Sequence, residues 1–206
     1  MKALDFNMPK EIEFNFEKGI TSFKGSRVLI FDANIMGLLR NNLIAELGEE
    51  KARAFLFKLD FQNAYEEFLN MKQNYEFDNE MELLASGPTI HTWRGIVQAT
   101  PKEIKFDKAA GKFYFTGVWS NSWEAEQYLM FNEKAKVPIC WSLTGYASGW
   151  CSAFFGSLTI AMEPVCVGKG DDHCEWLIKD AKSWGPELMF IKKFLRILTY
   201  RILLWD

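Results

Sequence analysis

Residues 158–178 read LTIAMEPVCVGKGDDHCEWLI, and this stretch decides the fold. Two apolar runs, 158–167 and 174–178, flank the turn-forming residues Gly-Lys-Gly-Asp-Asp at 168–172, so the segment predicts a β-hairpin. Pro164 cannot donate to a strand ladder, which favours a bend or bulge in the first arm of the hairpin. The hairpin places Cys166 and Cys174 close together near its turn.

The sequence on either side of the hairpin predicts helices and more antiparallel strands. Apolar residues recur at helical spacing or alternate, and Gly19, Gly25, Gly48 and Gly87-Pro88 punctuate them. Helices are expected at 35–47, 49–73, 79–85, 121–131, 137–155 and 186–206, and strands at 12–16, 27–31, 90–106 and 112–119. The predicted fold class is α+β: a mainly antiparallel sheet with packed helices, a zinc-bearing hairpin and a C-terminal linker helix.

All four cysteines lie between Cys140 and Cys174. Cys140, Cys166 and Cys174, with Glu163 as a carboxylate, form a set of four ligands that suits zinc, and such a closed set indicates a structural metal. Spacing alone leaves a second interpretation open, in which the thiols are small buried hydrophobic groups. His173 is a substitute ligand or an exposed turn residue, and Cys151 is expected in the core.

The composition excludes several classes of protein. The 206 residues have a net charge of -3, so a large nucleic-acid-binding face is not expected. The chain has no apolar run of about 18 residues and no signal-peptide core near Met1, which predicts a cytoplasmic protein without a transmembrane segment. A dinucleotide fingerprint, a phosphate-binding loop and a nucleophile–base motif are also absent from the sequence, so we expect no enzyme activity.

Three motifs together resemble the 4-vinyl reductase domain family, in the form found in sigma-54-dependent activators that respond to phenol and xylene. They are the segments 140–150, 163–166 and 168–174. Residues 38–53 and 87–95 are similar to the N-terminal sensor region of the same activators. The resemblance divides the chain into an N-terminal sensor and dimerisation region (1–120), a zinc-binding 4-vinyl reductase-like region (121–180) and a linker helix (181–206).

The resemblance implies roles for particular residues. A structural zinc is expected on Cys140, Glu163, Cys166 and Cys174. The positions that hold the hydroxyl group of a phenolic ligand match His91 and Trp119. Two further candidates for the wall of the same pocket, Trp93, two residues after His91 on the predicted strand, and Tyr146, do not come from the resemblance. The family also implies a homodimer and a downstream ATPase or other output domain.

We therefore expect a sensor domain that binds a small phenolic or monoaromatic effector and regulates transcription. Two other functions stay open at this point. The family name suggests a protein that assists reduction of a tetrapyrrole vinyl group. The apolar, basic segment 186–206 suggests instead a tether that carries a hydrophobic ligand or meets a lipid surface.

Overall fold

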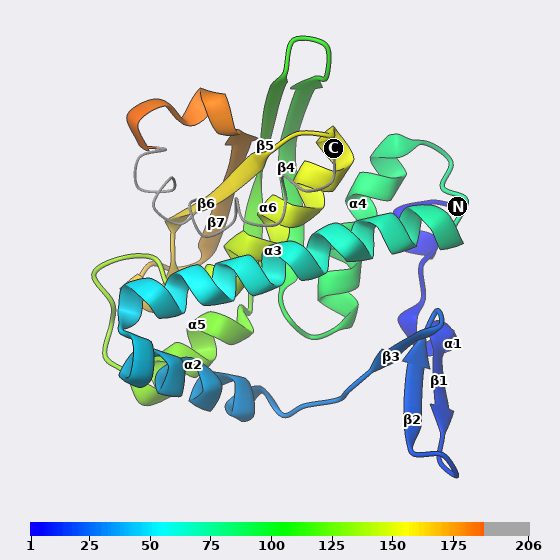
Figure 1. Cartoon of the computed structure of the whole chain (residues 1–206). Helices are drawn as coiled ribbons and strands as arrows, with labels where there is room; N and C mark the ends of the chain where they lie inside the picture. The colour runs from blue at the N-terminus through cyan, green and yellow to red at the C-terminus, as the bar shows by residue number, and fades with distance from the viewer. Residues whose placement is uncertain (188–206) are drawn as a thin grey trace.

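The computed structural model describes residues 1–187 and has the predicted α+β fold, with two antiparallel sheets. The small sheet has the order β1-β2-β3 (Ile12–Asn15, Ile20–Phe23, Ser26–Val28). The larger sheet has the order β4-β5-β7-β6 (Gln98–Asp107, Lys112–Ser120, Cys174–Asp180, Thr159–Val165). In Figure 1 the small sheet stands apart from the main body, joined to it by an extended segment before α2.

Five of the six α-helices found within residues 1–187 belong to the main body. They are α2 (Ala33–Leu47), α3 (Glu49–Asn74), α4 (Glu80–Trp93), α5 (Trp123–Phe131) and α6 (Trp141–Phe155). A short α1 (Met8–Glu11) precedes β1, and 3-10 turns occur at Ala3–Asp5, Val167–Lys169 and Ala181–Glu187. No helix within residues 1–187 is long and apolar enough to cross a membrane. The helix predicted over 186–206 falls almost wholly outside the described residues.

Two glycines allow α3 and α6 to pack closely. A Cβ atom added at Gly145 would lie 2.3 Å from the Phe57 carbonyl oxygen, and one at Gly149 would lie 2.1 Å from that of Phe61. Such distances are far below a normal contact, so only glycine lets the two backbones approach this way. Glycine has a low helix propensity, yet Gly145 and Gly149 lie inside α6 and allow it to pack against α3 (Figure 1).

The predicted boundary between the helix and the strand within residues 79–106 is wrong. Helix α4 does not end before Gly87-Pro88 but continues to Trp93, and β4 begins only at Gln98. Pro88 has no N–H to bond the carbonyl of Leu84 four residues earlier. That carbonyl instead accepts a hydrogen bond from the Trp150 indole at 3.0 Å. A tertiary contact thus satisfies the group that the proline leaves free.

A buried ion pair fixes the start of α6. Arg40 Nη1 lies 2.7 Å from Glu124 Oε1, and its guanidinium stacks 3.7 Å from the Trp141 ring. The Glu124 carboxylate also accepts hydrogen bonds from the first backbone N–H groups of the helix, at residues 141, 142 and 143. Negative charge at a helix N-terminus is favourable. The pair therefore ties α2 and α5 to α6, one residue from Cys140.

The largest buried cluster includes side chains from both sides of residue 120, among them Phe68, Trp119, Tyr146 and Ile178. The predicted division at 120 and 180 is not tested by these contacts and stays a prediction.

Candidate functional site

The four predicted metal ligands lie together. One ligand atom from each of Cys140, Glu163, Cys166 and Cys174 lies within 4.8 Å of the others, and all four residues are buried. Cys140 is the N-cap of α6, Glu163 belongs to β6, Cys166 follows β6, and Cys174 opens β7. The hairpin supplies three of the groups and the helix start supplies the fourth.

The bulge predicted at Pro164 is confirmed. The register between β6 and β7 shifts between Met162 and Val165. In a regular strand, Glu163 and Cys166 would point to opposite faces because they are three residues apart. The irregularity lets both side chains reach one site.

The chemistry of the cluster fits a metal ion. Glu163 Oε1 is buried and has no hydrogen-bond partner among residues 1–187, while Oε2 accepts the Cys140 backbone N–H at 3.1 Å. Burial raises the pKa of the Glu163 carboxyl to about 8 and also raises the pKa of the Cys140 thiol. A divalent cation would bond the free oxygen and offset the crowding of acidic groups, and three sulfurs with one oxygen suit zinc. His173 is not in the cluster; its Nε2 lies 3.1 Å from Glu175 Oε1.

A second feature is a cavity enclosed by α4, α6 and the inner face of the larger sheet. Three of the predicted pocket residues, His91, Trp119 and Tyr146, line it together. The other lining residues are mostly apolar or aromatic: Pro88, Ala99, Phe115, Ala147, Trp150, Cys151, Trp176 and Ile178. Its free volume is about 30 Å³. That space is of the size that holds water, so an aromatic ring can enter only when lining side chains turn aside.

His91 is the main polar group of the cavity wall. It is 4% exposed, and its ring centroid lies 3.7 Å from that of Tyr146. Burial, with a smaller effect from Arg94, lowers the pKa of His91 to about 3, so the imidazole is neutral near pH 7. A neutral imidazole offers one nitrogen that donates and one that accepts. Tyr146 is fixed because its hydroxyl donates to Glu67 Oε2 at 2.6 Å.

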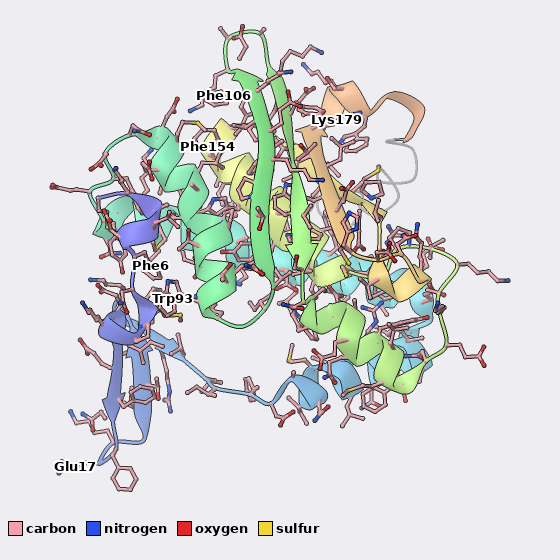
Figure 2. The ribbon with its side chains drawn as sticks, turned by 180° about the vertical axis from the view of Figure 1, so that it is seen from behind. Phe6, Glu17, Trp93, Phe106, Phe154 and Lys179 are labelled. Atoms are coloured by element: carbon pink, nitrogen blue, oxygen red, sulfur yellow. The ribbon has the colours of Figure 1, made fainter. Side chains whose placement is uncertain are left out.

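Trp93 lies elsewhere. The structure places it at the end of α4, 44% exposed, with its indole N–H donating to the Phe6 carbonyl at 3.0 Å. Figure 2 shows Trp93 beside Phe6, toward the N-terminal hairpin. Because residues 80–93 form a helix and not a strand, a separation of two residues sends His91 and Trp93 in different directions.

Sequence reasoning predicted Trp119 but missed Phe115 of β5 and Trp176 and Ile178 of β7, which complete the cavity. Phe115 and Trp119 of β5 share its inward face with Trp176 and Ile178 of β7. The sequence signal for the β7 residues is that Cys174, Trp176 and Ile178 stand at every second position, which predicts that they share one face of a strand, and in the structure all three are buried.

Gly117 of β5 makes room for the wall of the cavity. A Cβ atom there would lie 2.0 Å from Trp176 Cζ2 and 2.5 Å from the Thr100 carbonyl oxygen. We expect Gly117→Ala to push the Trp176 ring from its place and to destabilise the protein by about 1–3 kcal/mol. Thermal unfolding measures this loss of stability.

Gly111→Ala serves as a control for backbone strain without crowding, since Gly111 has a positive φ and no heavy atom within 4 Å of an added Cβ. Equal losses of stability in the two variants would contradict the packing role of Gly117.

Comparison with known proteins identifies the fold. A family model described as "Activator of aromatic catabolism" matches residues 7–107. Phenol regulator MopR of Acinetobacter guillouiae is 32% identical over 174 residues, which are 84% of this chain and 31% of that protein. The phenol-responsive sensory domain of the transcription activator PoxR, solved with phenol, superposes with a TM-score of 0.83 at 28% identity, covering 91% of this chain and 94% of that one. The chain matches the N-terminal aromatic-effector sensor domain of these activators.

A further relative is the transcriptional regulatory protein XylR of Pseudomonas putida. It is 27% identical over 188 residues, which are 89% of this chain and 32% of that protein. The chain thus spans about a third of the length of the curated relatives that it matches. The predicted resemblance to phenol and xylene activators is confirmed, and the relatives are named as regulators, which agrees with the expected non-enzymatic role.

Proposed function

We propose that this chain binds a small phenolic or monoaromatic effector in the cavity lined by His91, Trp119 and Tyr146, and that binding regulates a transcription-activation module. One observation carries the proposal. A chain whose fold matches a phenol-responsive sensory domain encloses an aromatic cavity that holds a neutral, buried histidine. Apolar walls with a few placed polar groups are typical of small-molecule sites.

The polar groups suit a phenolic hydroxyl. The Trp119 indole N–H can only donate, so it would bond the phenol oxygen. The unprotonated nitrogen of His91 would accept the phenol proton. A ligand without a hydroxyl leaves these groups unpaired, at a cost of about 1–3 kcal/mol each.

Calorimetric titration of phenol, with toluene and benzoate for comparison, tests the proposal. We expect saturable phenol binding, weakened about 5- to 150-fold in His91→Ala, the range that 1–3 kcal/mol corresponds to. Because the pKa of His91 is lowered to about 3, affinity should change little between about pH 6 and 8.

Trp93→Phe is the matched control, because Trp93 lies outside the cavity lining. It should bind phenol as the native chain does. A folded native chain that binds none of the three ligands would contradict the proposal.

We also propose a structural zinc ion on Cys140, Glu163, Cys166 and Cys174. The unpartnered Glu163 oxygen and the four mutually close ligand atoms support it. With four protein ligands the ion would have no open position for water, so its role would be to hold the β6–β7 hairpin against the start of α6.

A homodimer is the third part of the proposal, together with a cytoplasmic location. The β1–β2 hairpin and the segment before α2 expose large apolar side chains, namely Phe14, Phe16, Leu29, Ile30 and Phe31, at 64% to 98% exposure. Exposed apolar patches of this kind mark interaction surfaces. We expect sedimentation equilibrium to give a dimer, and Ile30→Asp with Phe31→Asp to raise the dissociation constant at least about tenfold. An unchanged dimer in that variant, or a monomeric native chain, would argue against this surface.

A further inference from the structure

Trp176 is a cavity residue whose indole N–H has no hydrogen-bond partner in the part of the chain that the structure describes. It lies in β7, is 3% exposed, and its ring packs between Phe115 (centroids 5.9 Å apart) and Trp119 (5.2 Å). Its indole Nε1 is buried and has no hydrogen-bond partner among residues 1–187. A buried donor without a partner costs free energy, and native proteins keep few such groups.

Other tryptophans of this chain use their indole N–H groups as hydrogen-bond donors within the protein. Four of them donate to a backbone carbonyl at 3.0 or 3.1 Å: Trp93 to Phe6, Trp141 to Pro138, Trp150 to Leu84 and Trp184 to Ile160. Trp176 differs from these four, and it lines the cavity together with Trp119.

The Trp176 ring cannot readily turn to find a partner. It lies over Gly117, where even a Cβ atom would come within 2.0 Å, and aromatic rings close it in on two sides. Because the Trp176 ring is held in this way, its own N–H does not have to be reoriented for a ligand, which favours binding.

We propose that the Trp176 N–H is a second hydrogen-bond donor to the effector, so that the cavity selects aromatic rings carrying two oxygen acceptors over rings carrying one. The inference rests on the proposed function, in which Trp119 and His91 hold the first oxygen. The Trp119 and Trp176 rings are neighbours, with centroids 5.2 Å apart, and both line the cavity, so one bound ring would lie close to both indoles.

Matched ligand pairs test this on the native protein. In each pair a hydroxyl replaces a methyl group of similar size: 1,2-dihydroxybenzene against 2-methylphenol, and 1,3-dihydroxybenzene against 3-methylphenol. We expect calorimetry to show at least one dihydroxy compound binding about fivefold or more tightly than its methyl partner, although the methyl compound is more apolar. Methylphenols that bind as tightly as, or more tightly than, both dihydroxy compounds would overturn the inference.

Trp176→Phe assigns the effect to the indole. The variant keeps an aromatic ring and loses the N–H. We expect it to bind the preferred dihydroxy compound about fivefold or more weakly, and the methyl partner of that compound within about twofold of the native chain. Equal weakening of both ligands would show a packing role only and would overturn the proposal, as would unchanged binding of both.

The two proposals fail in different ways. Loss of the second donor would remove selectivity between the paired ligands and leave phenol binding and its dependence on His91 in place. Absence of binding by every phenol in the native chain would refute the effector site itself. If Trp176→Phe does not fold, as judged by near-ultraviolet circular dichroism, the ligand pairs on the native chain still decide the matter.

Discussion

Cys166→Ser is expected to remove bound zinc and to lower the unfolding temperature by at least about 10 °C, or to prevent folding. The cluster joins β6, β7 and the start of α6, and a structural zinc contributes an apparent binding free energy of about 10–16 kcal/mol. The net stability of a domain is only about 5–15 kcal/mol, so loss of the ion removes most of it. Elemental analysis of the native chain should give one zinc per chain.

Cys151→Ala is the matched control. Cys151 is also buried and free, but it lines the cavity and is not part of the four-residue cluster. Its variant should keep zinc and lose only about 1–2 kcal/mol, as for a small core truncation. A native chain that unfolds at the same temperature with and without a chelator would contradict the structural role of the metal.

Arg40→Met is expected to destabilise the protein by about 3–5 kcal/mol, the cost of leaving a buried charge without its partner. Both side chains of the pair are almost wholly buried, with 3% and 1% exposure. The variant leaves Glu124 to bond only the helix N–H groups. Thermal or urea unfolding gives the loss.

The pH dependence identifies Glu124 as the cause. Burial raises the pKa of Glu124 from 4.5 to about 7. Between these values the native chain binds more protons than the unfolded chain, so this group lowers stability as pH rises. Without Arg40 the pKa should rise further and the decline should continue to higher pH. A surface control, Lys105→Met, should change neither stability nor its slope; Arg40→Met behaving like that control would show that the pair contributes nothing.

The proximity of Cys140, Glu163, Cys166 and Cys174 was predictable from a pattern that is mostly local, together with the resemblance. Three of its four groups lie within the hairpin of residues 163–174, where turn residues set the pairing, and Pro164 indicates the bulge that turns Glu163 inward. His91 and Trp119 came from the resemblance, and the structure places both on one cavity.

What the sequence did not reveal depends on contacts between distant segments. Helix α4 continues past Pro88 because the indole of Trp150, far away in the sequence, donates a hydrogen bond to the Leu84 carbonyl. Helix α6 keeps Gly145 and Gly149 because α3 lies against them. Trp93 was misplaced as a consequence of the first error, and the unpaired N–H of Trp176 is visible only when every neighbour is in place.

A crystal structure of the chain with phenol is the most direct test that the cavity is the effector site. We predict electron density for one ring inside the cavity, with its oxygen within hydrogen-bond distance of both His91 and the Trp119 Nε1. Density for phenol only at the surface, with the cavity closed around its own side chains, would contradict the account.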